Sequence, residues 1–401
     1  MLRQEQTYTL TRDALLRDLH KAYVDASRGK HGKSYVRVFE RHLEKNLSEL
    51  CDDLWNRTYK PLPATCFPIS DPTMREVIAA QFRDCIVNHL YHNYTEKPFE
   101  RTFIADSYAC IKGRGTHYGI ARLKKHVRSA TRNFTAPCLC LQMDIKGYFI
   151  HIRRSILCRA VEDKIRRISS HRITKGSPER WCDVLDIDFL LYLTQTLCLH
   201  DPMEDCVVLG SEREWEGLPD SKCMRKAEPG RGIAIGNLDS QQFSNVLLDI
   251  LDQFVKRCLQ RRHYGRSVDD FYVLGATKRE LRRVARRIGG FISKVLDLEI
   301  NVKKTRITDI YDGIRFLGQF ILPHSSHVAS RTFRRMRARR DDLLRSDASP
   351  ERVRNGMNAW LGVLVNTDSF RKRITFCLPV TEHAPVAGQF NNDYTKMVLA
   401  N

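Results

Sequence analysis

The sequence predicts an α+β protein, in which short strands carry acidic residues at their ends and amphipathic helices pack around them. Two apolar, aromatic-rich runs within residues 263–274 flank the pair Asp269-Asp270, a pattern typical of a β-hairpin with both acids at its turn. A second apolar strand, residues 139–143, leads directly into Asp144. Most of the remaining chain shows apolar residues at helical spacing.

The N-terminal part is predicted to be mostly helical. Apolar residues recur with helical spacing through residues 1–55. Residues 59–71 are interrupted by proline, so we expect them to be extended. Asp71 could cap a helix that follows Pro72 and continues to Leu90.

The middle of the chain is expected to alternate between strands and helices. Residues 99–118 are predicted to form a strand and a glycine-rich turn, followed by a basic helix that ends near Arg132. Helices are expected at residues 153–168 and 179–199. Residues 201–231 are polar and rich in Gly and Pro, which predicts a long loop.

Helices return after the glycine-rich segment that precedes Asn237. The helix that starts there has one apolar face, and Asp239 with Gln242 resembles a capping box. Residues 278–297 predict a basic amphipathic helix. Residues 331–345 concentrate arginines, which indicates either a solvated helix face or a surface that binds a polyanion.

Composition narrows the possible partners. The 401 residues are enough for two or three domains or subdomains. Lys and Arg total 67 against 47 Asp and Glu, a net charge of +20 that favours a polyanionic partner. Structural RNA-binding proteins share this excess, so charge alone does not indicate catalysis.

Cysteine usage and hydropathy indicate the compartment. The thirteen cysteines include no C-x-x-C pair, so we expect neither a zinc site nor a disulfide framework, and a reducing compartment fits. There is no signal peptide and no apolar run of about 18 residues. We therefore expect a soluble, cytoplasmic protein without a membrane partner.

The three strand-end acids indicate a metal centre. Adjacent aspartates repel each other, so a buried pair usually needs a cation to keep both ionised. Asp144, Asp269 and Asp270 could together hold two divalent ions about 3.5–4 Å apart, as in polymerases. An ordinary solvated turn is the alternative for an Asp-Asp pair. Strand alternation puts Leu141 and Met143 on the face opposite Asp144.

In order and spacing, these segments resemble reverse transcriptases, and most closely those of diversity-generating retroelements. The similarity spans roughly residues 60–330. The matching segments are Leu62 to Arg75, Ser107 to His117, Asp144 with Phe149, Gly232 to Gln241, Val268 to Asp270, Lys303 to Thr305, and Gly313 to Gly318.

The resemblance implies a right-hand polymerase. Residues 1–135 would form N-terminal helices and fingers. Residues 136–325 would form a palm, an antiparallel sheet backed by helices that carries the catalytic motifs. Residues 326–401 would form a helical thumb and a C-terminal segment.

The resemblance also implies RNA-directed DNA synthesis by two-metal nucleotidyl transfer. Asp144, Asp269 and Asp270 would be catalytic and would hold two Mg²⁺ ions, with Mn²⁺ as a substitute. The backbone of Ile145 would complete the metal site. The template would be a structured retroelement RNA, copied into cDNA with frequent errors at adenines.

Further residues are assigned to the nucleotide by the same resemblance. Phe149 would exclude the 2′ hydroxyl beneath the incoming sugar, or would simply be a core Phe. Lys112 and Arg114 would wrap the triphosphate, with Arg75 and Arg83 as further candidate cations. Lys304 would protonate pyrophosphate, or would be an ordinary surface Lys.

The segment around Gly236 indicates the subtype. Most relatives have Gln before this Gly and Pro after the following Ser, whereas this chain has Ile235 and Gln241. Ile235 offers only a non-directional contact to the nucleotide, so wrong pairs lose less relative to right ones. The alternative is that Ile235 merely packs behind the helix.

Two segments are assigned to nucleic acid. These are the turn that resembles a primer grip, and the basic helix that would hold the template in the thumb: Phe316, Leu317, Gly318, Arg331, Arg334 and Arg335. The implied partners are the template RNA, the RNA/cDNA duplex, dNTPs and a small basic, oligomeric accessory protein. A retron, intron or phage-defence reverse transcriptase without targeted mutagenesis is one alternative, and a non-catalytic RNA-binding scaffold is the other.

Overall fold

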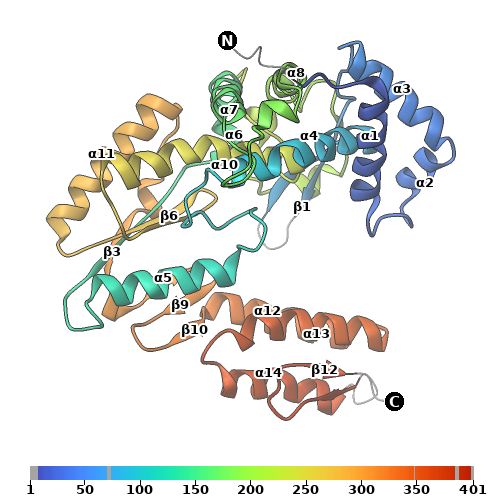
Figure 1. The fold of residues 1–401 in the computed structure, drawn as a ribbon. Coiled ribbons are helices and arrows are strands. Elements are labelled where there is room, and N and C mark those ends of the chain that lie inside the picture. Colours follow the sequence, from blue (N-terminus) through green and yellow to red (C-terminus); the bar gives the residue numbers. More distant parts are fainter. Residues whose placement is uncertain (1–7, 70–73, 347, 384–387, 399–401) are drawn as a thin grey trace.

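The computed structural model describes residues 8–69, 74–346, 348–383 and 388–398. A central sheet carries helices on both faces, and a separate helical layer, formed by the C-terminal part of the chain, lies beside them (Figure 1). Across the described segments, none of the helices has the length and apolar character needed to cross a bilayer.

The predicted N-terminal helices are confirmed. They are α1 (Arg12–Ser27), α2 (Ser34–Glu40) and α3 (Leu43–Trp55), and α1 packs along α4 (Phe82–Glu100). The apolar faces of these helices join the main core, which extends into the central sheet.

The helix predicted to follow Pro72 is wrong over its first part. Strand β2 (Arg75–Ala79) pairs there with the antiparallel β1 (Thr65–Ile69), and α4 begins only at Phe82. Alternate residues of β2 are buried, which is the pattern of a strand in a sheet rather than of a helix. Asp71, the predicted cap, lies outside the described residues.

The strand predicted within residues 99–118 is also wrong. After α4, the chain makes consecutive turns and a single bridge, Ser107 to Arg266, before α5 (Thr116–Ala130). Gly113 and Gly115 have φ values of +75° and +138°, so the backbone there cannot continue as a strand.

The segment between the first acid and the glycine-rich loop differs in detail from the prediction. Helix α6 (Tyr148–His151) precedes α7 (Arg154–Ser169), which packs against α8 (Ile187–Leu199). Helix α8 is shorter than predicted because the carboxylate of Asp186 accepts a hydrogen bond from the N–H of Phe189 and caps it.

The predicted loop 201–231 contains some regular structure. It includes the two-residue strand β4 (Val207–Val208), parallel to β1, and the single-turn helix α9 (Glu212–Trp215). Short 3₁₀ turns at Asp220–Lys222 and Met224–Lys226 complete it. The segment therefore packs onto β1 instead of extending freely.

The central sheet is antiparallel with the strand order β5-β6-β3-β7. Its strands are β5 (Tyr264–Ser267), β6 (Asp270–Gly275), β3 (Leu139–Asp144) and β7 (Arg306–Asp309). Strands β5 and β6 are the predicted hairpin, and β3 is the predicted acidic strand.

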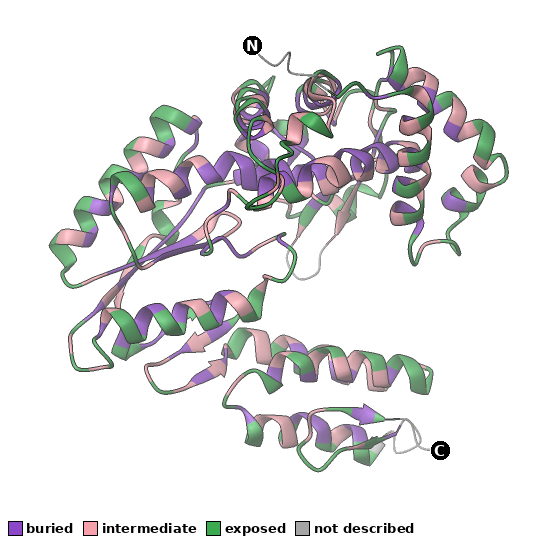
Figure 2. Cartoon of the chain, in the orientation of Figure 1, coloured by how far each residue is buried: buried purple, intermediate pink, exposed green. Residues whose placement is uncertain are grey.

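Both faces of this sheet are covered. Helices α10 (Leu238–Gln253) and α11 (Lys278–Leu296) share the main core with Leu141. Cys140, on the opposite face, belongs to a second cluster with α5 (Thr116–Ala130). Figure 2 shows that buried residues concentrate in β3, β6 and α10.

The chain ends in a second antiparallel sheet and three helices. Strands β8 (Ile314–Phe316), β9 (Gln319–Ile321) and β10 (Ser326–Val328) are adjacent in that order, so the predicted boundary at 325/326 falls inside a sheet. The elements that follow are α12 (Ser330–Arg345), α13 (Pro350–Val365), α14 (Phe370–His383), β11 (Gln389–Phe390) and β12 (Met397–Val398).

A fully buried ion pair connects the acidic hairpin to α10. Arg266 donates to both carboxylate oxygens of Asp252, at 2.9 and 2.7 Å. It also donates to the carbonyl of Val268, the amide oxygen of Asn245 and the hydroxyl of Ser107. Burial opposes the charge of Arg266, but Asp252 raises the pKa of its guanidinium overall. One side chain thus joins the hairpin, helix α10 and the 101–115 turns.

Removing one partner of this pair should destabilise the protein strongly. Arg266→Met leaves the Asp252 carboxylate buried without its cation, so we expect a loss of about 3–5 kcal/mol in the free energy of unfolding. Arg266→Met/Asp252→Leu should recover much of that loss. Urea unfolding measures both, with Arg282→Met on the exposed face of α11 as the matched control. A cost equal to that of the control would refute the role of the pair.

Candidate active site and nucleic-acid interface

The three predicted catalytic acids lie at the same end of adjacent strands. In the pairing of β3 with β6, Asp144 is directly opposite Asp270, and such partners have Cα atoms about 4.5–5.5 Å apart. Asp269 occupies the β5–β6 turn, and its carbonyl accepts the N–H of Ile145 at 3.3 Å. Segments far apart in the sequence therefore meet as predicted.

Asp144 is held by a short segment before β7. Its carboxylate accepts hydrogen bonds from Lys304 Nζ at 2.7 Å and from Asn301 Nδ2 at 3.1 Å. The backbone N–H of Asn301 also donates to the Asp144 carbonyl, at 2.8 Å. Asn301 was not predicted, because the segment Asn301-Val302-Lys303-Lys304 carries no distinctive pattern.

Lys304 lies inside the acidic cluster rather than on an unrelated surface. Burial lowers the pKa of its ammonium, but the hydrogen bond and charge of Asp144 outweigh this and raise it. Lys304 therefore keeps its positive charge beside the carboxylates, although 63% of its side chain remains exposed to solvent.

The carboxyl groups of the hairpin ionise less readily than usual. Burial first, and then repulsion by Asp144, raise the pKa of Asp269 to about 6. The same two causes raise the pKa of Asp270 to about 6. Negative charge thus accumulates here beyond what Lys304 balances.

The donor set suits a hard divalent ion, with one rearrangement. Mg²⁺ prefers oxygen ligands, and three carboxylates at one strand end provide them. Within the described ranges, however, no three Asp, Glu, His or Cys side chains already surround a common metal position. Lys304 and Asn301 each donate to one oxygen of the Asp144 carboxylate and leave lone pairs free, so side chains would have to move, without necessarily losing these hydrogen bonds, for Asp144 to join Asp269 and Asp270 around an ion.

The β5–β6 turn, which consists of Val268 and Asp269, is strained. Val268 has a φ of +55°, a conformation that β-branched residues rarely adopt. The hydrogen bond from Arg266 to its carbonyl, at 3.0 Å, helps to maintain it. Such strain persists where surrounding contacts determine the backbone, often at functional sites.

Phe149 lies beside the glycine-rich loop. It belongs to α6 (Tyr148–His151), is half-buried, and accepts the N–H of Ile233 at 3.0 Å through its carbonyl. Gly232 has a φ of +91°, and a Cβ there would lie 2.1 Å from the sulfur of Met224. The positive φ favours glycine at this position, whereas the side chain of Met224 could move away.

Two predicted nucleotide-binding residues line one cavity. Lys112 from the 101–115 turns and Gln241 from the first turn of α10 both line a cavity of about 300 Å³. Ile235 is half-buried and Gly236 is exposed just before that turn. The structure thus brings together Lys112 and Gln241 from distant segments.

Arg114 and Arg75, which were also predicted to contact the triphosphate, do not line the cavity of Lys112. Arg114 donates to the carbonyls of Ile104 and Ser107 at 2.6 and 2.9 Å, so its guanidinium organises the turns themselves. Arg75 is exposed on β2 and is not among the residues that line the cavity of Lys112. Lys112 is therefore better placed than either for contact with a ligand in that cavity.

The predicted primer-grip residues form a tight hairpin turn. Leu317 and Gly318 both have positive φ, at 48° and 79°, and connect β8 to β9. Phe316 is only 2% exposed and packs edge-on against Tyr272, with ring centroids 5.2 Å apart. Its side chain is part of the core, so only the turn itself is accessible to nucleic acid.

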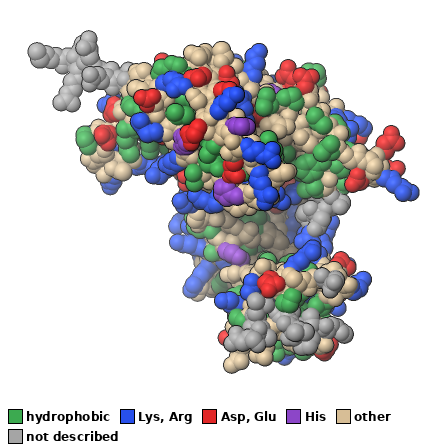
Figure 3. Space-filling view, turned by 90° about the vertical axis from the view of Figure 1, so that its right-hand side faces the viewer, with side chains coloured by type: hydrophobic (Ala, Val, Ile, Leu, Met, Phe, Trp, Pro, Cys, Tyr) green, Lys and Arg blue, Asp and Glu red, His purple; other side chains and the backbone are tan. Residues whose placement is uncertain are grey.

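The basic helix lines a groove next to this turn. Arg331 and Arg334 of α12, with Arg315 and Lys372, line a cavity of about 520 Å³, which we call the thumb groove after the predicted thumb. Arg335 is half-buried instead, and its Nε has no hydrogen-bond partner among the described residues. Figure 3 shows a hollow between the body and the C-terminal layer, bordered by Lys and Arg side chains.

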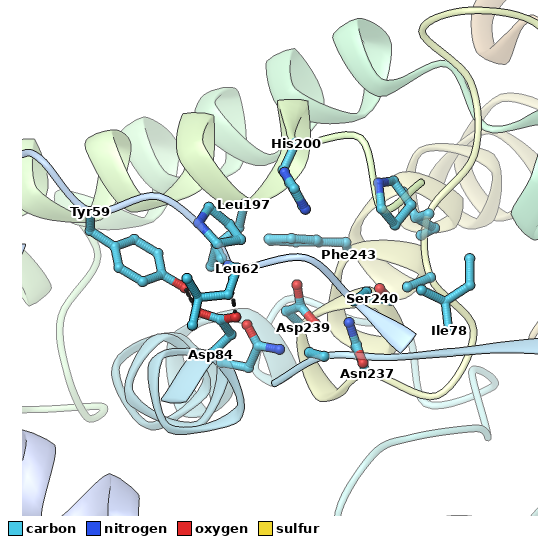
Figure 4. Close-up of a pocket in the computed structure, with 17 residues that line it drawn as sticks. Tyr59, Leu62, Ile78, Asp84, Leu197, His200, Asn237, Asp239, Ser240 and Phe243 are labelled. Atoms are coloured by element: carbon cyan, nitrogen blue, oxygen red, sulfur yellow. Dashed lines mark hydrogen bonds between the residues drawn. The ribbon is translucent and has the colours of Figure 1, made fainter. Parts of the chain in front are cut away.

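A buried carboxylate lies behind the glycine-rich loop. Asp239 was predicted to form a capping box with Gln242, but within the described residues no side chain caps the N-terminus of α10. Asp239 instead lines a cavity of about 50 Å³ together with Asp84 and Phe243 (Figure 4). Among the described side chains and backbone groups its Oδ1 has no hydrogen-bond partner, and burial raises the pKa of Asp239 to about 6 despite the nearby N–H of Ser240.

Comparisons with known proteins give only distant similarities. No family model matches the chain. Protein YkfC of Escherichia coli (strain K12) is 23% identical over 319 residues, which covers 71% of this chain and 73% of YkfC.

Solved structures with a distantly similar arrangement include two telomerases. One is from Candida albicans in complex with a TWJ fragment of telomeric RNA (14% identity, 83% of this chain, 61% of that chain, TM-score 0.46). The other is apo telomerase from Candida tropicalis (13% identity, 81% of this chain, 60% of that chain, TM-score 0.47). This chain spans about three fifths of each telomerase chain. Similarity at this level carries no functional argument, so function must be argued from the site.

The buried Asp239 carboxylate should make stability depend on pH. Because its pKa is raised to about 6 from 3.8, the folded protein binds more protons than the unfolded chain between these values, and stability falls as pH rises through 6. Asp239→Asn should therefore raise the free energy of unfolding at pH 7.5 by about 1–3 kcal/mol. The gain should shrink towards pH 4.5. Urea unfolding across this range, with exposed Asp163→Asn as the control, checks both; equal curves for the two variants would contradict the assignment.

Proposed function

We propose that this chain is an RNA-directed DNA polymerase that copies a retroelement template RNA into cDNA in the cytoplasm. The observation that carries the proposal is the register of β3 and β6, which sets Asp144 opposite Asp270 with Asp269 in the adjoining turn. Three carboxylates at one strand end are what metal-dependent nucleotidyl transfer requires.

The acids would hold the reaction's cations. Asp144, Asp269 and Asp270, with the backbone of Ile145, would bind two Mg²⁺ ions, which Mn²⁺ could replace. When bound, such ions lower the pKa of a primer 3′ hydroxyl and neutralise charge on the triphosphate and pyrophosphate. The raised pKa values of Asp269 and Asp270 support this, because uncompensated negative charge attracts cations.

Other residues of the chain would position the nucleotide and the duplex. Lys112 and Gln241, which line one cavity, would contact the triphosphate and the base or sugar of a dNTP. Phe149, beside the glycine-rich loop, would exclude the 2′ hydroxyl of a ribonucleotide. Lys304, once released from Asp144, could donate a proton to the departing pyrophosphate. The thumb groove would hold the RNA/cDNA duplex through phosphate contacts.

The finer proposal is an error-prone enzyme of a diversity-generating retroelement. Ile235, half-buried beside the exposed Gly236, supplies no hydrogen bond by which a correct nucleotide could be favoured. The implied partners are a structured template RNA and a small basic, oligomeric accessory protein.

One observation favours a second function, an RNA-binding scaffold without catalysis. The Asp144 carboxylate is bound by Lys304 and Asn301, which is how a permanently inactive site would be stabilised. The two functions differ in whether the wild-type chain extends a primer when Mg²⁺ is added. The scaffold would bind RNA equally well with or without the ion.

Neutralising the hairpin acids should abolish synthesis. Asp269→Asn/Asp270→Asn removes two of the three charges that would hold the ions, so Mg²⁺-dependent primer extension on an RNA template should fall about 10³-fold or more. RNA binding should remain nearly unchanged. Asp163→Asn/Asp312→Asn, at two exposed positions, removes the same charge and is the matched control. Retained synthesis by the hairpin variant would refute the assignment.

Restoring a hydrogen-bonding side chain at position 235 should improve accuracy. Ile235→Gln offers a directional contact to the correct nucleotide, so misincorporation opposite template adenines should fall on the order of tenfold. Deep sequencing of the cDNA measures this. Ile235→Leu, which keeps an apolar side chain, should leave the error pattern as it is. If both variants behave alike, residue 235 does not determine fidelity.

A further inference from the structure

A second basic cavity lies away from the acids. It has a volume of about 570 Å³ and forms where the C-terminal ends of α4, α7 and α10 meet residues 171–181. Four exposed arginines, Arg101, Arg167, Arg172 and Arg257, line it, and we call it the arginine groove.

The arginine groove is separate from the proposed nucleotide cavity. Gln241 lies in the first turn of α10, whereas Gln253, at the last position of the same helix, lines the groove. A helix rises 1.5 Å per residue, so the two positions are about 18 Å apart along the axis. A ligand in the groove would therefore not compete with a nucleotide at Gln241.

The charges in the arginine groove are not balanced by the protein. Its one carboxylate, Asp249, is already paired with the buried Lys164 and accepts a hydrogen bond from Gln253 at 2.8 Å. Within the described part of the chain, the four arginines form no ion pair.

Some half-buried arginines elsewhere have an acidic partner. Arg12 pairs with Asp52 at 2.6 Å, and Arg231 pairs with Asp297 at 2.9 Å. The four arginines of the groove lie in a single concavity and repel each other, a cost that a bound polyanion would remove.

An aromatic side chain in the arginine groove narrows the choice of polyanion. Trp181 is half-buried and lines the same cavity as the arginines. Regularly placed cations with an accessible aromatic ring are how proteins bind single-stranded nucleic acid, since phosphates meet the cations and a base stacks on the ring. A duplex would offer phosphates but no free base.

We propose that the arginine groove binds a single-stranded segment of RNA outside the catalytic cleft. The choice of RNA rests on the proposed function, in which the chain handles an RNA template. The groove would hold an unpaired part of that RNA while another part occupies the thumb groove. Binding itself requires neither metal nor synthesis, so it can be tested independently.

The test measures binding of a fluorescein-labelled, unstructured RNA of 20 nucleotides by anisotropy, with EDTA present. All proteins carry Asp269→Asn/Asp270→Asn, so failure of the polymerase proposal cannot alter the result. They also carry Arg331→Gln/Arg334→Gln, which weakens the thumb groove and prevents it from masking the effect.

Neutralising the arginine groove should weaken this binding. Arg167→Gln/Arg172→Gln/Arg257→Gln should raise Kd roughly tenfold and reduce the slope of log K against log salt by about 2, the value for three lost phosphate contacts on a single strand. The control Arg17→Gln/Lys21→Gln/Lys33→Gln removes equal charge from exposed positions in α1 and just before α2. A Kd within about twofold of the control would overturn the proposal.

Trp181 distinguishes single-stranded RNA from other polyanions. Trp181→Ala should weaken the single-stranded probe roughly tenfold through lost stacking, while binding of a 20-base-pair RNA duplex and of heparin should be unchanged. Trp181→Phe, which keeps a ring and guards against misfolding, should retain most of the affinity. Equal losses for all three probes, or none for the single strand, would overturn the proposal.

Discussion

The bidentate pair between Arg266 and Asp252 is the constraint on which the acidic hairpin depends. Arg266 lies two residues before the strained Val268, and its guanidinium reaches α10, the hairpin turn and Ser107 together. Without this cation, Asp252 would be a lone buried charge and the turn would lose a hydrogen bond that holds it. The positions of Asp269 and Asp270 are thus fixed from beneath by an interaction that takes no part in chemistry.

Around the strand ends, negative charge exceeds positive charge. Asp144 is neutralised by Lys304, whereas Asp269 and Asp270 have raised pKa values because of burial and repulsion. A divalent ion would relieve the repulsion and compete with Lys304 for Asp144. In the proposed enzyme, Lys304 would neutralise Asp144 until a metal ion binds there.

Local patterns predicted much of this molecule, and the failures have physical causes. The acidic strand and hairpin were predictable because alternation and turn chemistry are local, and their convergence followed from the order of motifs. Strand β2 was missed because it is only five residues long, and its apolar residues also continue the helical spacing of the segment that follows. Asp239 was misread because a capping box and a buried acid share one sequence pattern. Asn301 and the fixed role of Arg114 depend on tertiary contacts, which no local pattern reveals.

The attachment of the C-terminal helices has a mechanical consequence. Strand β10 continues into α12 through Ala329 alone, whose N–H donates to the carbonyl of Gly318. The same hairpin presses Phe316 onto Tyr272 in β6, two residues beyond Asp270. The C-terminal layer that lines the thumb groove is therefore closely connected to the strands that carry the acids. In a polymerase of the kind proposed, a distorted duplex in the thumb groove would therefore shift strand β6. A mispair that has already been incorporated would then change the geometry of the acids, where the next bond forms.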